Sequence, residues 1–350
     1  ASLAEGETSP NPLVGSIVID ESNQLVGEGF HSKAGSPHAE IGALKQAGQR
    51  AKGGTLLVNL EPCCHHGRTP PCVEEIIRAG IKQVIVAHED PDPRVSGGGI
   101  ARLKEAGINV FCGLMKEEAA YQNRAFFFRV KYGRPWGILK WAMSLDGRIA
   151  LPNGESKWIS CERARRWVHH LRAKTDAVIV GGGTVRSDNP HLNTRGIATK
   201  EPLRVVLTRT FDLPLQANLW NQSASKTLIA YKSSSFNEKF LEIEKKVDFL
   251  PLEDTQPEKL MTELASRNCN QVLWECGPKL ATEALKQGCV QEIAVIVSPK
   301  ILGGKPAKTP LDDFGMTSMD QVLLMKYANS TKLGNDWLFN MYCPTGEKVI

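Results

Sequence analysis

Strand-like and helix-like segments alternate along the whole chain, and this alternation constrains the fold more than any other feature. In the first third, the apolar runs LVGSIVID, GTLLVNL, QVIVAHED and NVFCGL are separated by PHAEIGALKQAG, PPCVEEIIRAG and GIARLKEAGI, which have helical spacing. The alternation starts again at WGILKWAMSLDGRIA and continues through DAVIVGGG, LRVVLTR, KTLIAY, QVLWECG and EIAVIVSPKIL. This pattern predicts α/β layers with parallel strand pairing. LVGSIVID and LVGEGFH are instead expected to form a hairpin around ESNQ.

The chain is long for a single hydrophobic core. With 350 residues, two domains are expected. Near residues 117–134 the pattern becomes aromatic and basic, in YQNRAFFFRVKYGRPW, and we place the boundary there. The sequence therefore predicts a first domain at 1–118, a linker at 119–134 and a second domain at 135–350.

Charge and cysteine usage favour a soluble protein that acts on a small molecule. The net charge is +5, but basic and acidic residues are interspersed, which does not indicate nucleic-acid binding and leaves room for an anionic small substrate. No apolar run approaches the roughly 18 residues of a membrane-spanning helix. Most of the nine cysteines are dispersed, which is typical of a reducing compartment. We expect a cytoplasmic protein; the absence of a first Met suggests trimming and keeps a plastid stroma as the alternative.

One segment, LEPCCHHGRTPPC at residues 60–72, concentrates the ligands that zinc prefers. It contains three cysteines and two histidines. The spacing of a closed zinc finger is absent, because two adjacent cysteines do not easily reach one ion and Cys72 lies eight residues beyond Cys64. A self-contained site with four ligands is therefore the weaker interpretation. The segment is better read as part of a site completed from elsewhere.

The upstream tripeptide HAE supplies the missing part. Zinc deaminases of nucleobases carry the pattern H-x-E followed by P-C-x-x-C, in which the glutamate moves protons. Here His38 and Glu40 form the first half, and Pro62 and Cys63 begin the second. The second cysteine departs from this pattern, because Cys72 follows nine positions after the first instead of three. The start of a helix at Cys72 would favour its thiolate form. Buried cysteines beside a solvated His-Glu pair are the non-functional alternative.

The second half of the chain shows two glycine-containing turns. DAVIVGGGTV is a strand that runs into three glycines, but it does not fit the dinucleotide pattern G-x-G-x-x-G. QVLWECGPKLATEAL reads as a strand, a turn at Gly277 and Pro278, and a helix whose free N–H groups suit a diphosphate. A Rossmann domain is therefore not predicted.

Several long motifs resemble the bifunctional deaminase/reductase family of riboflavin biosynthesis. SPNPLVGSIV, GEGFHSKAGSPHAE, LEPCCHHGRTPPC and DPDPRVSGGGI resemble its deaminase half, including the long cysteine spacing. LKWAMSLDGRIA, LRAKTDAVIVGGGTVRSDNPHLNTR, WECGPKLATEAL and SPKILGG resemble its reductase half. The resemblance implies a cytidine-deaminase-like three-layer domain followed by a dihydrofolate-reductase-like domain. It also implies Zn²⁺ and NADPH as cofactors: a phosphoribosylated diaminopyrimidinone loses an amino group, and its ribose is then reduced to a ribityl chain.

The family's functional residues map onto matching positions of this sequence. For the deaminase, the resemblance implies zinc ligands at His38, Cys63 and Cys72, the proton carrier at Glu40, and substrate contacts at Asn11, His31, His65 and Arg68. The guanidinium of Arg68 is suited to gripping phosphate with two hydrogen bonds. A solvated loop arginine is the alternative for that position.

For the reductase, the resemblance implies two further sets. The NADPH contacts are Ala142, Trp158, Thr184, Asp188, Gly277, Pro278, Lys279 and Leu280, and the substrate contacts are Ser156, Arg172, Leu192, Arg195 and Glu275. Arg172 and Arg195 suit a substrate phosphate, and Arg209 suits the 2′-phosphate of the cofactor. Lys140 is expected to polarise the sugar during hydride transfer, with a surface strand lysine as the alternative.

The sequence also allows three alternative interpretations. A deaminase of free nucleosides or of a tRNA base predicts a basic, aromatic strand-binding face, which the interspersed charges do not favour. A non-catalytic zinc scaffold predicts four protein ligands and no role for Glu40. A monofunctional relative predicts that one set of catalytic residues is missing, whereas both sets are present. We expect a phosphoribosylated pyrimidine as the substrate, a homo-oligomer, and neither nucleic acid nor membrane as a partner.

Overall fold

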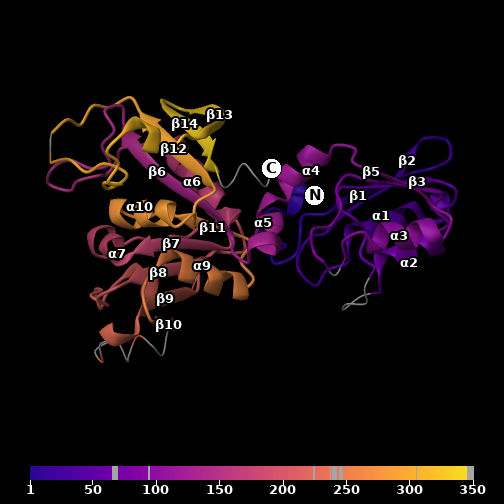
Figure 1. The fold of residues 1–350 in the computed structure, drawn as a ribbon, viewed down its shortest axis with the longest axis horizontal. Coiled ribbons are helices and arrows are strands. Elements are labelled where there is room, and N and C mark those ends of the chain that lie inside the picture. The colour runs from indigo at the N-terminus through magenta and orange to yellow at the C-terminus, as the bar shows by residue number, and fades with distance from the viewer. Residues whose placement is uncertain are drawn as a thin grey trace. The chain divides into compact units, whose positions relative to one another are not determined.

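The computed structural model describes residues 1–64, 70–93, 95–223, 225–236, 238, 243, 247–304 and 306–344. The chain divides into one compact unit formed by Ala1–Gly133 and a second that begins at Arg134. Each unit has its own β-sheet, covered by helices that come from the same part of the chain (Figure 1). The α/β class expected from the alternating pattern is confirmed in both.

The first unit contains a five-stranded sheet in the order β2-β1-β3-β4-β5. Its elements are η1 (Ser2–Ala4), β1 (Gly15–Ile19), β2 (Leu25–Phe30), α1 (Ala39–Ala47), η2 (Gly48–Ala51), β3 (Thr55–Val58), α2 (Cys72–Arg78), β4 (Gln83–Val86), α3 (Gly98–Glu105), β5 (Asn109–Cys112), α4 (Lys116–Gln122) and α5 (Arg124–Tyr132). β1 pairs antiparallel with β2, as the hairpin prediction required, whereas β3, β4 and β5 are parallel. The carboxyl ends of these parallel strands therefore meet at one edge of the sheet.

Helices α1, α2 and α3 lie together on one side of this sheet (Figure 1). Alternate strand residues, such as Leu56 and Val84, pack against apolar helix residues, such as Ala43, Ile76 and Leu103, in one core. Period-two alternation in the strands and helical spacing between them produce this layer. The core holds the ends of the strands and the starts of the helices in fixed positions, and the site described below lies there.

The segment predicted as a linker, 119–134, is mostly helical. It contains the end of α4 and all of α5, and Phe126 and Phe127 are buried with Leu60 and Ala120 in a small second cluster. α5 ends where Gly133 adopts a left-handed conformation with φ of 66° and donates its N–H to Arg129. The aromatic run of this segment therefore contributes to the first unit as packing.

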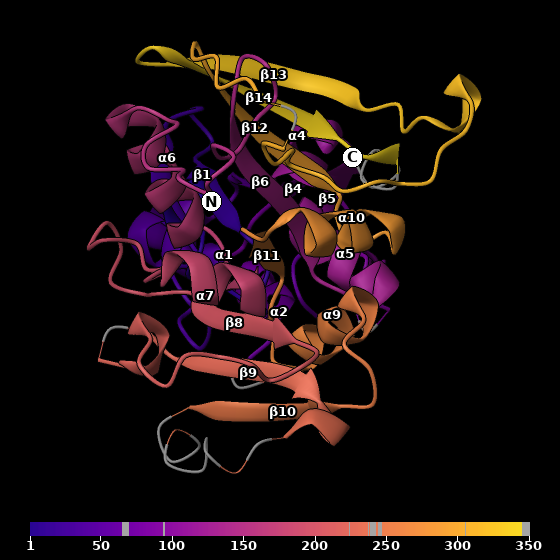
Figure 2. The ribbon, with the colours of Figure 1, turned by 90° about the vertical axis from the view of Figure 1, so that its left-hand side faces the viewer.

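The second unit contains a nine-stranded sheet. Its elements are β6 (Trp136–Ser144), α6 (Glu162–Ala173), β7 (Ala177–Gly181), α7 (Gly182–Asp188), β8 (Leu203–Thr208), η3 (Asn218–Trp220), β9 (Thr227–Lys232), η4 (Ser233–Ser235), β10 (Asp248–Leu252), α9 (Pro257–Ser266), β11 (Gln271–Trp274), α10 (Pro278–Lys286), β12 (Glu292–Ser298), η6 (Met319–Gln321), β13 (Lys326–Leu333) and β14 (Asp336–Tyr342). The strand order is β10-β9-β8-β7-β11-β6-β12-β14-β13 (Figure 2).

Seven neighbouring strands of this sheet, from β10 to β12, are parallel, and β14 and β13 continue it antiparallel. The parallel strands are apolar on both faces, and β7 and β11 are almost completely buried. Such sheets bind ligands at the carboxyl ends of their strands. The ends of β6, β11, β7 and β8 meet at that edge, and they carry most of the residues assigned to the reductase from the sequence.

No helix among the residues that the structure describes combines the length and the apolar character needed to cross a membrane.

Candidate active sites

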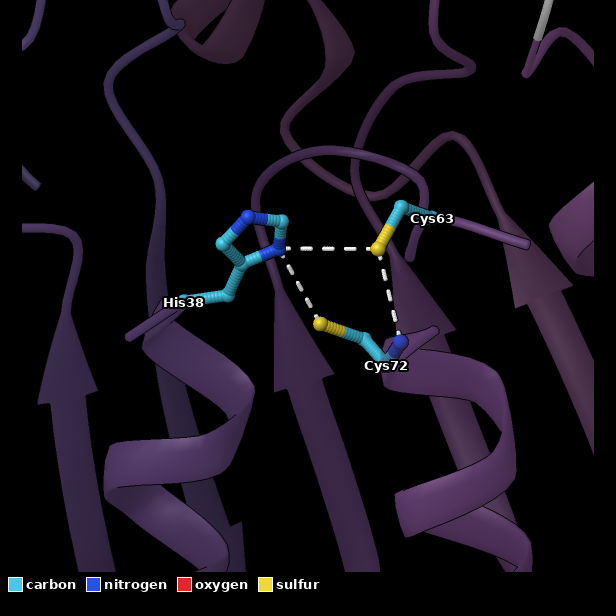
Figure 3. A group of neighbouring side chains, drawn as sticks. All are labelled: His38, Cys63 and Cys72. Carbon is cyan, nitrogen blue, oxygen red and sulfur yellow. Dashed lines mark hydrogen bonds between the residues drawn. The ribbon is translucent and has the colours of Figure 1, made fainter. Parts of the chain in front are cut away.

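Three side chains predicted as zinc ligands meet in the first unit. The ligand atoms of His38, Cys63 and Cys72 all lie within 4.8 Å of one another. Nδ1 of His38 lies 3.2 Å from Sγ of Cys72 and 3.5 Å from Sγ of Cys63 (Figure 3). Among the residues that the structure describes, no other group of three histidine, cysteine, aspartate or glutamate side chains lies close enough together to hold a metal ion.

Local structure explains why residues so far apart in sequence converge. His38 is the N-cap of α1, Cys63 follows the end of β3, and Cys72 is the first residue of α2. The start of α2 also contacts Cys63 directly, because the backbone N–H of Cys72 donates to its sulfur at 3.4 Å and that of Val73 donates to its carbonyl at 3.3 Å. Two helix starts and one strand end thus fix the cluster.

The three groups interact electrostatically as one unit. The hydrogen bond with Cys72 lowers the pKa of the Cys63 thiol to about 4. The same interaction raises the pKa of Cys72, which stays protonated beside the thiolate. The hydrogen bond with Cys63 also raises the pKa of His38. A site that already favours one thiolate and can lose a second thiol proton is suited to a divalent cation.

The geometry fits zinc. Tetrahedral zinc with bonds of about 2.3 Å to sulfur and about 2.0 Å to nitrogen places sulfur and nitrogen ligands roughly 3.5 Å apart. The two nitrogen–sulfur distances at His38, 3.2 and 3.5 Å, are close to that value. Three protein ligands leave the fourth position open, as in catalytic zinc sites. The four-ligand scaffold is not supported among the described residues.

Glu40 lies in the first turn of α1, beside this cluster. Its residue is 3% exposed, and its Oε2 atom is buried without a hydrogen-bond partner. Burial raises the pKa of its carboxyl, against the opposing effect of the His38 charge. An unpartnered buried carboxylate oxygen next to a metal cluster is unusual, because such atoms are normally satisfied. Its position suits a group that takes up and releases a proton.

Asn11 and His31 lie next to the metal cluster and contact each other. Nδ2 of Asn11 is 3.0 Å from Nε2 of His31, and Nδ1 of His31 is 3.2 Å from the carbonyl of Pro37. The ring of His31 meets that of His38 edge-on, with centroids 5.5 Å apart. Burial lowers the pKa of His31, so this ring is neutral at pH 7 and donates to Pro37 through Nδ1. Both predicted substrate contacts thus flank the ligand His38.

Two other predicted substrate contacts, His65 and Arg68, lie outside the described residues. Cys64 directly follows the ligand Cys63, and it packs against the core of the first unit.

The second unit contains a cluster of three charged side chains predicted from the sequence. Glu275, which follows β11, accepts two hydrogen bonds from Arg172 of α6, at 2.6 Å from Nε and 3.1 Å from the terminal nitrogen. Nζ of Lys140, on β6, lies 3.8 Å from the same carboxylate. Burial alone would raise the pKa of Glu275, but Arg172 and Lys140 outweigh it and lower this pKa to about 2. Burial lowers the pKa of Lys140.

Two residues that the sequence reasoning missed complete this cluster. The second terminal nitrogen of Arg172 donates to the carbonyl of Asn193 at 3.0 Å and lies 3.4 Å from Nδ1 of His169. Burial lowers the pKa of His169, and the charges of Arg172 and Arg195 lower it further, which places Arg195 near the cluster. The three-residue spacing of His169 and Arg172 on one helix was the available signal for the first. No sequence signal distinguished Asn193.

The two glycine-containing turns lie side by side. A Cβ built on Gly277, the N-cap of α10, would lie 3.9 Å from Oγ1 of Thr184 in the first turn of α7. A Cβ built on Gly181 would lie 3.4 Å from the side chain of Leu280. The starts of α7 and α10 therefore lie next to each other, and free backbone N–H groups at both are suited to phosphate.

The other residues predicted for the reductase lie on β6, α7 and α10 and in the loops that follow β6, α7 and β8. Ala142 is on β6, Pro278 and Lys279 begin α10, Asp188 ends α7, and Arg209 directly follows β8, where it is exposed. Leu192 is buried and Arg195 exposed between α7 and β8, and both have positive φ. Ser156 and Trp158 lie between β6 and α6. Trp158 is 62% exposed, with the guanidinium of Arg165 4.4 Å above its ring.

Comparisons with known families match both halves of the chain. Residues 1–88 match the cytidine and deoxycytidylate deaminase zinc-binding region, and residues 135–339 match the RibD C-terminal domain. The Synechocystis riboflavin biosynthesis protein RibD is 50% identical over 98% of this chain and 93% of its own length. The Aquifex aeolicus protein of the same name is 41% identical over 96% and 93%.

Solved structures give the same result. Acinetobacter baumannii RibD superposes with a TM-score of 0.88 at 37% identity, over 98% of this chain and 95% of that one. A Thermotoga maritima protein described as a diaminohydroxyphosphoribosylaminopyrimidine deaminase/5-amino-6-(5-phosphoribosylamino)uracil reductase superposes with a TM-score of 0.87 at 33% identity, with the same coverage. Relatives of this similarity extend over both units.

Proposed function

The chain belongs to the RibD family of riboflavin-biosynthesis proteins, and from this premise we propose which of its residues carry out the two reactions. It is a bifunctional enzyme that has a zinc-dependent deaminase domain and an NADPH-dependent reductase domain. The deaminase step removes an amino group from the phosphoribosylated diaminopyrimidine. The reductase step converts the ribosyl group of 5-amino-6-(5-phosphoribosylamino)uracil to ribityl.

In the deaminase, His38, Cys63 and Cys72 hold the zinc ion. Bound zinc supplies a water molecule activated for attack on the pyrimidine ring at neutral pH. Glu40 takes up the proton that the attacking water releases, at its unpartnered Oε2 atom, and gives it to the ring nitrogen. It then carries a second proton, from the new hydroxyl group, to the departing amine. Burial raises the pKa of Glu40, which favours uptake of a proton by this carboxylate. Asn11 and neutral His31 orient the substrate, and His65 and Arg68 bind its phosphate.

In the reductase, NADPH supplies a hydride to the sugar. The starts of α7 and α10, with Thr184 and Gly277, hold the cofactor's phosphates. Lys140 points its ammonium toward Glu275 and stays available to a sugar oxygen because its separation from that carboxylate, 3.8 Å, is long for a hydrogen bond. Arg172 already donates three hydrogen bonds to Glu275 and Asn193, which favours exposed Arg195 as the residue that binds the substrate phosphate.

The observation that carries the proposal for the deaminase is the unpartnered oxygen of Glu40 beside the three-ligand cluster. We expect Glu40→Gln to retain about one zinc per chain, because it changes no ligand, and to abolish ammonia release. Reduction of pre-deaminated substrate by NADPH should continue. Glu28→Gln, on the exposed part of β2, is the matched control. Undiminished ammonia release by Glu40→Gln would refute the assigned role.

Removal of zinc tests the cofactor assignment separately. A chelator should stop ammonia release and leave NADPH-dependent reduction intact, because the two sets of residues lie in different compact units. Added Zn²⁺ should restore the first activity. Loss of both activities together would contradict independent sites.

Assays with NADPH and NADH in parallel test the role of Arg209, since only NADPH carries the 2′-phosphate that this arginine is assigned to bind.

We also propose that the protein forms a homo-oligomer. On the face of the first sheet opposite α1 to α3, the register aligns Ile17, Leu57, Ile85 and Phe111 across four strands. Ile17 is 36% and Phe111 60% exposed, and apolar rows of this kind mark association surfaces. Sedimentation should show an oligomer that Phe111→Lys dissociates. A monomeric parent protein would refute the proposal.

We propose that the protein acts in a reducing compartment, such as the cytoplasm or a plastid stroma, because its cysteines do not form disulfides in the structure. All nine are free thiols. Titration of the native protein with a thiol reagent, before and after reduction, should give the same count. A lower count before reduction would contradict this assignment.

A further inference from the structure

The sequence motif DPDPRVSGGGI contains no proposed ligand or substrate contact, and it ends in the first turn of α3. The structure connects it to Glu61, which lies two residues before the ligand Cys63. Glu61 is 4% exposed. Its carboxylate accepts backbone hydrogen bonds from Asp90 at 3.2 Å and Gly97 at 3.0 Å through Oε2, and from Ile100 at 3.0 Å through Oε1.

This arrangement is a helix cap supplied from another strand. Gly97 is the N-cap of α3 and Ile100 its third residue, so both N–H groups lack partners within the helix. No side chain of the N-cap residue can satisfy them, because that residue is glycine. Glu61 does so instead, and the negative charge is favourable at the positive end of α3. A buried carboxylate with three backbone donors is held in one position.

The backbone around Cys63 also packs directly on this helix start. A Cβ on Gly99 would lie 2.0 Å from the carbonyl oxygen of Pro62, and a Cβ on Gly98 would lie 2.9 Å from the sulfur of Cys64. The consecutive glycines therefore let α3 approach the segment 61–64 more closely than any other residue would allow. The Glu61 hydrogen bonds and these contacts constrain the segment on both sides of Cys63.

We propose that Glu61 is a positioning residue of the deaminase site, which fixes Cys63 for metal binding by anchoring the residues on either side of it to the start of α3. Such supporting interactions typically change metal affinity by about 10-fold to 100-fold. The inference rests on the proposed role of Cys63 as a zinc ligand. It adds Asp90, Gly97 and Ile100 to the structural basis of that site.

The test measures zinc affinity of the full-length chain by competition with a chromogenic chelator. Glu61→Gln keeps the shape of the side chain, but its amide nitrogen cannot accept a hydrogen bond, so at least one of the three buried N–H groups loses its acceptor. We expect zinc to bind about 10-fold more weakly. Ammonia release should fall at limiting zinc and recover in excess zinc, which loss of folding would not allow.

Glu89→Gln is the matched control, because Glu89 is exposed and adjoins Asp90 in the same segment. It should bind zinc as the parent protein does. Zinc affinity of Glu61→Gln equal to that of the parent would overturn the inference and leave the ligand assignment intact. If the parent protein bound no zinc, both the inference about Glu61 and the assignment of the zinc ligands would fail.

A second variant decides the question if Glu61→Gln does not fold. Gly98→Ala keeps every charge and adds one methyl group that pushes the start of α3 against Cys64. It should weaken zinc binding by less than the expected loss for Glu61→Gln. Unchanged zinc affinity in folded Gly98→Ala protein would then overturn the inference.

Discussion

Glu275 and Arg172 form a bidentate ion pair, with N–O distances of 2.6 and 3.1 Å, between the end of β11 and the last turn of α6. Their side chains are only 11% and 13% exposed, so the pair is largely shielded from solvent. Lys140 brings a second cation to the same carboxylate. The carboxylate therefore holds two cations from different elements at the site assigned to the reductase.

Replacing Glu275 by glutamine should damage both stability and reduction. The variant leaves two buried cations with one neutral partner, and breaking a buried pair in this way costs about 3 kcal/mol. Loss of the charge also frees Arg172 and Lys140 to move, so NADPH-dependent reduction should fall sharply while ammonia release persists. Urea unfolding and the two assays measure these effects.

Glu258→Gln provides the control for this prediction. Its pair with Arg134 has a similar separation, 3.0 Å, but Glu258 is 58% exposed. Its loss should change the free energy of unfolding by less than about 1 kcal/mol. Equal effects from the two variants would show that burial does not distinguish these pairs.

The same carboxylate predicts a specific response to acid. Its ordinary pKa is 4.5, and in the folded protein Arg172 and Lys140, acting against burial, lower it to about 2. A folded pKa below the unfolded value contributes stability that is complete above about pH 4.5 and is lost as the pH falls toward 2. The difference in unfolding free energy between parent and Glu275→Gln should therefore shrink across this range. A constant difference down to pH 2.5 would contradict the lowered pKa.

The sequence predicted most of the helices and strands, but it did not predict every hydrogen-bond partner within the two sites. Strand alternation and helix starts indicated the elements correctly, because these depend on residues close together in the chain. The metal cluster was also accessible, since the types and order of His38, Cys63 and Cys72 carry a chemical pattern. Glu61 and Asn193 were not. The side chain of Glu61 accepts from backbone N–H groups 29 or more residues away, and Asn193 contributes only its backbone carbonyl, to Arg172, 21 residues away.

The segment 119–134 shows a second reason for the difference. Its aromatic and basic composition was interpreted as a linker between two domains, and the compact units do divide at its end, between Gly133 and Arg134. The sequence did not show that the buried rings of Phe126 and Phe127 pack against Leu60, which is far away in sequence. Burial of this kind depends on tertiary contacts and leaves no local pattern. The local sequence signal of a helix end was the glycine at position 133, which adopts a left-handed conformation at the end of α5.

Gly277→Ala tests the phosphate site without disturbing the fold. Gly277 has φ of −72°, and an added Cβ would meet only Oγ1 of Thr184, at 3.9 Å, so the free energy of unfolding should not change. The methyl group would lie between the starts of α10 and α7, where the phosphates are assigned. We expect the KM for NADPH to rise about 10-fold, equivalent to about 1.4 kcal/mol of binding. Ammonia release by the same protein is the internal control, and an unchanged KM would place the cofactor elsewhere.

Asn123, between α4 and α5, holds the segment that carries Asn11. It is buried, accepts from the backbone N–H of Leu13 at 2.8 Å and donates to the carbonyl of the same residue at 3.0 Å. Asn123→Ala leaves the half-buried N–H of Leu13 without its acceptor and should cost about 1 kcal/mol. Because Leu13 lies two residues from Asn11, the KM of deamination should rise while zinc content stays the same. Exposed Asn109→Ala should alter neither. Lower stability with an unchanged KM would show that α4 and α5 support the fold of the first unit without positioning the substrate.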